Sequence, residues 1–159
     1  MKSINFERLW GIVIAQFPLG IYSMHGPQHW KQVEKNGLML AKETKADEII
    51  IKLFSLFHDS RRKNENIDCW HGLRGYELAK SMKGIHFDLP DLSFKILMDA
   101  CIYHPCGWQS SDITTATCWD ADRLDLPRVG IIPNPDKMGT ADGKIRAAQY
   151  EISWRGDNG

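Results

Sequence analysis

The most apolar segment of the chain ends on an adjacent histidine and aspartate, His58 and Asp59. Residues 54–65 read FSLFHDSRRKNE, with bulky apolar side chains before the pair and three basic residues after it. Burying an ionisable side chain is costly unless the group is paired or bound to a metal ion. The pair is therefore either a structural hydrogen bond or part of an ion-binding site.

Other histidines are placed in the same way. Each lies on the apolar face of a different predicted helix or at its end, and the complete set is His29, His58, His71 and His104. One such histidine alone is more often a core residue that is hydrogen-bonded to a backbone carbonyl. Four of them, together with Asp59 and the acidic residues at 120–122, point to a shared metal centre.

Imidazole and carboxylate ligands from several helices can surround two metal ions in the core of a bundle. The mixture suits iron, manganese or zinc better than magnesium, so we expect one or two divalent ions of that kind. A zinc site made by Cys101, Cys106 and Cys118 is an alternative, but the chain has no C-x-x-C spacing. Buried free thiols are the preferred interpretation of these cysteines.

Mostly helical elements must position these residues. The hydrophobic pattern predicts helices over 6–17, from Pro27 through Ala41, and over 46–57, 68–82, 90–104, 119–126 and 140–152. The 46–57 segment is apolar nearly all round, which fits a buried helix or a buried strand, and its length favours the helix. We expect a loop over 106–118. The length of the chain suits one all-α domain over 1–159, a helical bundle with a metal centre in its core.

The composition narrows the functional classes. Twenty basic and twenty acidic residues give zero formal net charge, which does not support a nucleic-acid or membrane partner. No stretch reaches the ~18 apolar residues of a membrane span. The first residues, MKSINFERLW, do not form a cleavable signal pattern. The cysteines are therefore expected to be reduced and the protein cytoplasmic.

The order of the candidate ligands resembles the HD superfamily of metal-dependent phosphohydrolases. HWKQV resembles the first metal-binding helix of that family, LFHDSRR its eponymous His-Asp, and ADRL its closing aspartate motif. The histidines in WHGLRGYELA and CIYHPCGW are similar to those of members that hold two metals. The resemblance covers about residues 22–130. HGPQHW, FHDSRR and CWDADRLDL resemble a small bacterial branch without a well-defined activity.

The resemblance implies a division of the ligands between two metals. His71 and His104 would bind the second metal, with Asp59 bridging to the first. The ligands of the first metal would be His29, His58, Asp59 and Asp122.

Some neighbouring residues compete with these ligands or support them. Asp120 is the alternative to Asp122 as the metal ligand, and Asp122 is preferred because it lies in the ADRL motif. Asp120 and Asp125 would then cap, pair with arginines or hydrogen-bond a ligand histidine. His25 is expected to support a ligand or to face substrate, because Gly26 and Pro27 separate it from the helix of His29.

The resemblance also implies an activity, the hydrolysis of a phosphate ester by metal-activated water. The partner would be a small phosphorylated molecule, a nucleotide being one candidate. Arg61 or Arg62 could bind phosphate oxygens through the arginine fork, and we expect Asp59 and Arg62 to be the catalytic residues. Two alternatives stay open. HD-like diiron oxygenases use the same six ligands, and a metal-stabilised binding domain would have no activity.

Overall fold

The computed structural model describes residues 4–157, so the ends of the expected domain, 1–3 and 158–159, lie outside the described residues. Over the described range the chain forms α-helices and short 3-10 helices and no strand, which confirms the all-α prediction. The α-helices are α1 (Phe6–Ala15), α2 (Pro27–Thr44), α3 (Glu48–Phe57), α4 (His71–Met82), α5 (Asp91–Tyr103), α6 (Ile113–Arg123) and α7 (Ala141–Asp157). The 3-10 helices are η1 (His104–Cys106), η2 (Leu126–Val129) and η3 (Pro135–Lys137).

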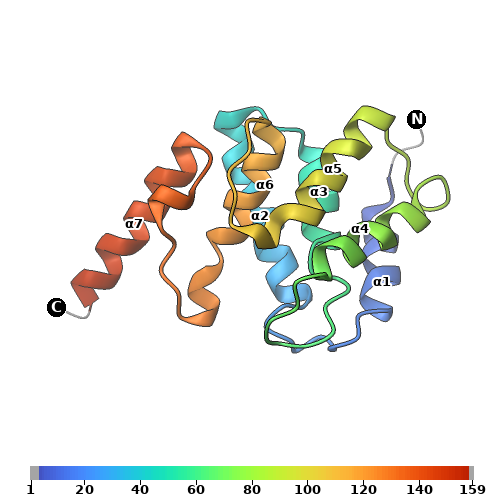
Figure 1. The fold of residues 1–159 in the computed structure, drawn as a ribbon, viewed down its shortest axis with the longest axis horizontal. Coiled ribbons are helices and arrows are strands. Elements are labelled where there is room, and N and C mark those ends of the chain that lie inside the picture. Colours follow the sequence, from blue (N-terminus) through green and yellow to red (C-terminus); the bar gives the residue numbers. More distant parts are fainter. Residues whose placement is uncertain (1–3, 158–159) are drawn as a thin grey trace.

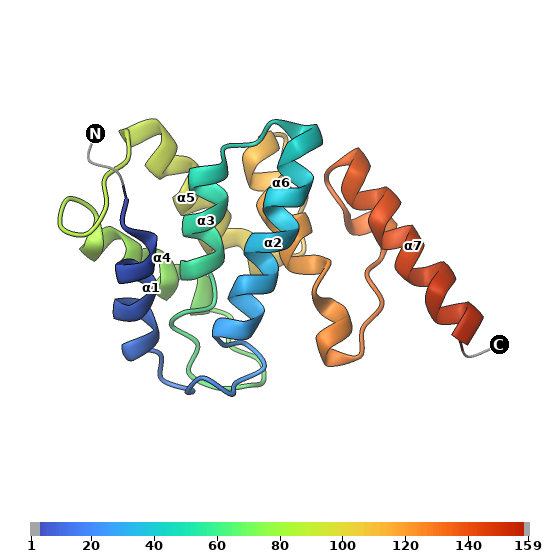
Figure 2. The same cartoon turned by 180° about the vertical axis from the view of Figure 1, so that it is seen from behind.

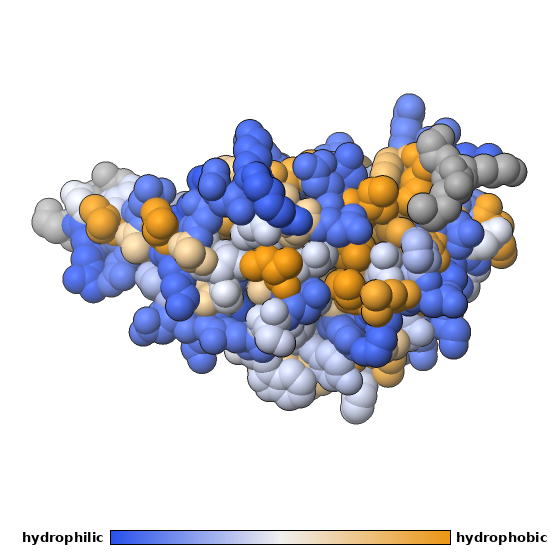
Figure 3. Space-filling view, turned by 90° about the horizontal axis from the view of Figure 1, so that it is seen from above, coloured by the Kyte–Doolittle hydropathy of each residue, from blue (hydrophilic) through white to orange (hydrophobic). Residues whose placement is uncertain are grey.

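Helix α3 lies at the centre of the bundle, in contact with α1, α2, α4, α5 and α6 (Figure 1). The reverse view shows α1 and α7 towards opposite ends of the molecule (Figure 2). Seen from above, polar side chains cover much of one face, while apolar ones gather towards the N-terminal end and others lie on α7 (Figure 3). The two loops that join α1 to α2 and α3 to α4 lie together on the opposite side (Figures 1 and 2).

The central segment is a helix and not a strand. Asp47 caps α3, because its side chain accepts hydrogen bonds from the backbone N–H groups of Ile49 and Ile50. The side chains of α3 from Leu53 to Phe57 are all buried, so the second half of the helix is enclosed on every side by its neighbours. This burial accounts for a sequence that is apolar nearly all round.

Helix α2 approaches α3 closely. Pro27 occupies its first turn, where the missing N–H leaves no hydrogen bond unmade. A Cβ atom on Gly37 would lie 2.5 Å from the Ile51 side chain, so glycine at this position lets the two helices meet. The buried face of α2 includes His29.

The prediction of a loop over 106–118 was wrong, because α6 begins at Ile113. Threonines have low helix propensity, which made this stretch read as loop. The helix forms because Asp112 caps it, accepting from the Thr115 N–H at 2.7 Å, and because its threonines are buried, two of them with hydrogen-bonded hydroxyls. The Thr114 hydroxyl accepts from the Asp47 N–H, and the Thr117 hydroxyl donates to the Ile113 carbonyl.

The four cysteines are free thiols, two of them buried (Cys101 and Cys118) and two exposed (Cys69 and Cys106). Among the described residues, the groups whose geometry could hold a metal consist of histidine and aspartate and include no cysteine. None of the described helices is both long and apolar enough to cross a membrane.

Candidate metal centre

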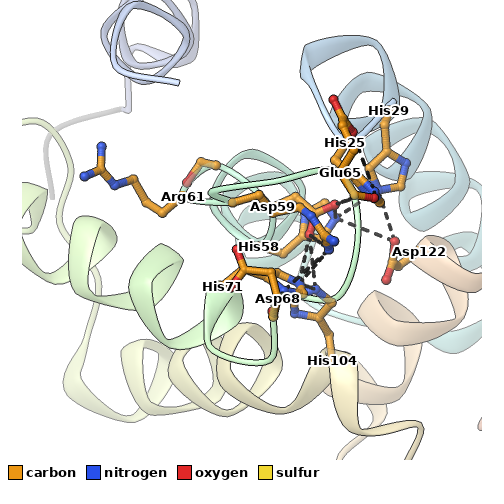
Figure 4. A network of polar contacts seen from close by, with 12 residues as sticks. His25, His29, His58, Asp59, Arg61, Glu65, Asp68, His71, His104 and Asp122 are labelled. Carbon is orange, nitrogen blue, oxygen red and sulfur yellow. Dashed lines mark hydrogen bonds and ion pairs between the residues drawn. The ribbon is translucent and has the colours of Figure 1, made fainter. Parts of the chain in front are cut away.

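The side chains predicted as ligands converge at one place from five different helix regions (Figure 4). His29 lies in the first turn of α2, and His58 and Asp59 follow the last residue of α3. His71 is the first residue of α4, and His104 follows α5. Asp122 comes from the last turn of α6. Asp59 lies between the other five side chains, which form two groups on either side of it (Figure 4).

The first group surrounds His29. Its Nε2 atom lies 3.1 Å from the Nε2 of His58, 3.1 Å from Oδ1 of Asp122 and 3.5 Å from Oδ2 of Asp59. The Nε2 of His58 lies 3.6 Å from Asp122 and 3.7 Å from Asp59. The Nε2 atoms of His29 and His58 therefore both face the two carboxylates.

The second group contains His71, His104 and the other oxygen of Asp59. The Nε2 atoms of the two histidines lie 2.9 Å apart, and they lie 3.0 and 3.4 Å from Oδ1 of Asp59. One carboxylate thus presents Oδ2 to the first group and Oδ1 to the second. This is the arrangement of a carboxylate that bridges two cations.

In each of these four histidines, the Nδ1 atom, which points away from the centre, faces a hydrogen-bond acceptor. Nδ1 of His58 faces the Ser55 carbonyl at 3.0 Å and Nδ1 of His104 faces the Cys101 carbonyl at 2.7 Å. The corresponding acceptors are the Asp68 carbonyl for His71 and the Asp125 carboxylate, at 2.7 Å, for His29. Because Nδ1 donates in each case, each ring, when neutral as a metal ligand must be, presents the lone pair of Nε2 inward. Metal-binding histidines are oriented by this kind of support.

The distances fit a metal ion. Ligands about 2.1 Å from a metal, at angles between 90° and tetrahedral, lie about 3.0–3.4 Å from one another. The inward donor atoms are 2.9–3.7 Å apart, close to those edge lengths. The groups of described residues that could hold an ion include His29 with His58 and Asp59, and Asp59 with His71 and His104.

The electrostatics of the centre favour a cation. Burial by itself raises the pKa of Asp59, but the surrounding histidines, His58 foremost, outweigh it and hold the pKa well below its usual range. The pKa of Asp122 is held well below its usual range in the same way, against burial, by hydrogen bonds to His29 and His58. Burial also acts to lower the pKa of His29, but hydrogen bonds to Asp122 and Asp125 raise it to about 9. Asp59, which is buried, and Asp122, which is half-buried, therefore stay ionised, and their negative charges favour a cation at this place.

Two glycines let α4 bring His71 into the centre. A Cβ on Gly72 would lie 2.2 Å from the Cys101 carbonyl oxygen and 3.2 Å from Nδ1 of His104. A Cβ on Gly75 would lie 2.2 Å from the carbonyl oxygen of Phe57, just before the His-Asp pair. The HGLRG stretch thus allows the α4 backbone to touch the elements that carry the other ligands.

The structure distinguishes the two aspartates of α6. Asp122 faces His29, whereas Asp120 accepts hydrogen bonds from the backbone N–H groups of Gly139 and Thr140 at 2.8 and 2.9 Å. Asp120 therefore fastens the chain ahead of α7 to α6. Asp125 supports His29, one of the roles expected for it.

The basic residues after the His-Asp pair point in different directions. Arg61 extends away from the centre towards the Gln16 carbonyl (Figure 4). Arg62 is buried, with NH1 3.9 Å from Oδ1 of Asp59 and 3.5 Å from both ring nitrogens of His71.

His25 and Arg128 make further contacts beside the centre. His25 supports Asp59, with Nδ1 3.4 Å from Oδ2. Sequence reasoning missed Arg128, which donates to the carbonyls of Met24 and Asp125 and so ties the loop before α2 to η2. No motif marks that position.

Comparison with known proteins supports the fold. No family model matches the chain, and no curated protein matches it. A crystal structure from an uncultured Thermotogales bacterium, described as a predicted HD superfamily hydrolase, is similar with a TM-score of 0.77. The similarity covers 99% of this chain and 91% of that one at 21% sequence identity. The chain therefore has an HD-type fold, as the sequence predicted.

Proposed function

We propose that the protein is a metal-dependent phosphohydrolase that acts on a small phosphate ester, a nucleotide being one candidate. The observation that carries the proposal is the bridging geometry of Asp59, whose two oxygens each face a separate pair of histidines. The HD-type fold of the predicted hydrolase from the Thermotogales bacterium supports the same class of reaction.

The residues of the chain have distinct tasks in this proposal. His29, His58, Asp59 and Asp122 would hold one ion, and His71, His104 and Asp59 a second. Iron, manganese and zinc are the metals that this donor set suits. When bound, such ions lower the pKa of coordinated water and neutralise the charge of a phosphate ester.

The other groups at the centre orient the ligands and meet the substrate. Asp125 and the backbone acceptors keep the imidazoles in the tautomer that presents Nε2. Arg62 directs NH1 into the centre, where a guanidinium can bind a phosphate oxygen. Asp59 and Arg62 are thus the residues we place against the reacting group.

Elemental analysis of protein loaded with manganese, iron or zinc tests the metal stoichiometry. We expect two equivalents in the wild type and one in the double variant His71→Ala plus His104→Ala. The variant His86→Ala, which alters a histidine outside the cluster, should keep both. Equal metal content in the wild type and the double variant would exclude the second ion.

A panel of phosphomonoesters and cyclic nucleotides, assayed with and without oxygen, tests the reaction. Release of phosphate or ring opening that is independent of oxygen is expected. Turnover that consumes oxygen would instead identify an oxygenase, and stable binding without turnover would identify a binding domain.

A further inference from the structure

The donors of the metal centre lie beneath two loops. The side chains of His58, His29 and Asp59 are only 0, 1 and 4% exposed. Two loops lie beside these atoms: the α1–α2 loop carries His25, which contacts Asp59, and the α3–α4 loop carries Glu65, which contacts His25 (Figure 4). The tip of the α3–α4 loop, residues 64–66, is held by two side chains that also contact the metal centre, Arg62 and His25.

Two side chains hold this tip. Arg62 donates from Nε to the Asn64 carbonyl at 3.3 Å and from NH2 to the Asn66 carbonyl. The Nε2 atom of His25 lies 3.3 Å from the Glu65 carbonyl and 3.8 Å from its carboxylate, while its Nδ1 atom faces Asp59.

The base of the same loop is anchored separately. The Asp68 carboxylate accepts hydrogen bonds from the Lys63 N–H and from Arg74. The tip can therefore move without release of the loop ends.

Arg62 faces the loop and the metal centre at once. Its NH1 points inward to His71 and Asp59, while Nε and NH2 point outward to the two carbonyls of the tip. A guanidinium is planar and its donors keep fixed relative directions, so an oxygen bound to NH1 also fixes the directions of Nε and NH2. A lysine, whose donors share one nitrogen, cannot bridge in this way.

We propose that Arg62 couples substrate binding to the loop: it closes the 64–66 tip over the metal centre when an anionic group binds NH1. The inference rests on the proposed function for the identity of that anion, a phosphate group. It adds that substrate binding and loop closure are one event. In this view the loop opens to admit substrate and to release product.

Proteolysis of the full chain at Glu65 measures opening of the tip. A glutamate-specific protease is added to manganese-loaded protein with and without inorganic phosphate as the probe, and the fragment that begins at Asn66 is followed by mass spectrometry. When opening is fast, the cleavage rate follows the fraction of open loop. Loss of the hydrogen bonds from Arg62 to the Asn64 and Asn66 carbonyls should raise the fraction of open loop roughly tenfold.

The matched variants are Arg62→Lys and Arg61→Lys. We expect phosphate to slow cleavage of the wild type and of Arg61→Lys roughly tenfold. Arg62→Lys should be cut faster without phosphate and should gain no protection from it. Cleavage of Arg62→Lys at the wild-type rate, or equal protection by phosphate, would overturn the proposal.

A second variant covers the case in which Arg62→Lys does not fold. Asn64→Ala removes the hydrogen bond that the Asn64 side chain accepts from the Asn66 N–H within the tip, and it keeps Arg62. It should be cut faster than wild type while retaining protection by phosphate, and loss of that protection would overturn the role of Arg62.

Failure of the proposed function would look different. Phosphate protection of the loop without hydrolysis of any ester would overturn the hydrolase and leave the loop inference standing. Hydrolysis of an ester by a protein whose loop gains no protection from phosphate would support the hydrolase and overturn the loop inference.

Discussion

The Nε2 atoms of His71 and His104 lie 2.9 Å apart, although the Nδ1 atom of each ring faces a backbone carbonyl. With both Nδ1 atoms donating, the neutral rings turn two lone pairs towards each other. A cation between them and Asp59 would convert this repulsion into attraction. A metal bound at this pair would therefore also stabilise the fold.

The first prediction is that metal stabilises the native protein. A ligand that binds only the native state at about 100 times its Kd adds about 2.7 kcal/mol of stability. Manganese or zinc should therefore raise the Tm of protein freed of metal by a chelator, and magnesium should raise it less. Calorimetry of the wild type and of His71→Ala plus His104→Ala checks this. Identical shifts in the two proteins would show that the second group of ligands binds nothing.

Replacing Asp125 tests the support behind His29. Asp125→Asn keeps an oxygen near Nδ1 at 2.7 Å but removes the charge that makes the imidazole a stronger ligand. Loss of such supporting partners typically lowers metal affinity about 10–100-fold. Competition with a chelating dye measures the change. Asp99→Asn, on the surface beside Lys95, is the control and should leave the affinity unchanged.

Two glycine substitutions should have opposite effects on stability. Gly75→Ala places a methyl group 2.2 Å from the Phe57 carbonyl, so the backbone must shift at a cost of about 1–3 kcal/mol. Gly11→Ala in α1 meets nothing within 4 Å and should stabilise its helix by about 0.5–1 kcal/mol. Urea unfolding of both variants gives the comparison. A neutral Gly75→Ala would mean that α4 can move away from the His-Asp pair.

The sequence predicted that these histidines would point into the core because each one lies on or at the end of a regular apolar pattern. His29 lies on a helix face with Val33 and Leu40, and His104 ends a face that contains Ala100. All of these residues are buried in the structure, as periodicity requires. The pattern does not contain the distances between helices, and so the sharing of Asp59 between two groups could be expected only from the family resemblance.

The features that the sequence analysis did not predict depend on the path of the backbone and on burial. Arg61 and Arg62 are adjacent, and their opposite orientations follow from how α3 ends, which sequence does not specify. The start of α6 was missed because burial of its threonines outweighed their low helix propensity. Arg128 acts through hydrogen bonds to backbone carbonyls, which leave no trace in residue type or spacing.

In metal-free protein, stability should fall as the pH rises. The pKa of His29 is raised from 6.5 to about 9 because hydrogen bonds to Asp122 and Asp125 outweigh its burial. A raised histidine pKa contributes stability that is fully present below the unfolded value of 6.5 and is lost as the pH passes about 9. Urea unfolding in excess chelator, across that range, measures the decline. His29→Gln should flatten it, and an equally steep decline in that variant would assign the effect to other groups.

The final prediction concerns the thiols. Burial raises the pKa of Cys101 and Cys118, so these thiols carry almost no thiolate, whereas Cys69 and Cys106 are exposed. A thiol-reactive disulfide reagent should therefore label two cysteines in the native protein and all four after denaturation. Cys69→Ser should reduce the native count by one. Zinc should not slow the labelling of Cys106, and protection by zinc would instead support a site built from Cys101, Cys106 and Cys118.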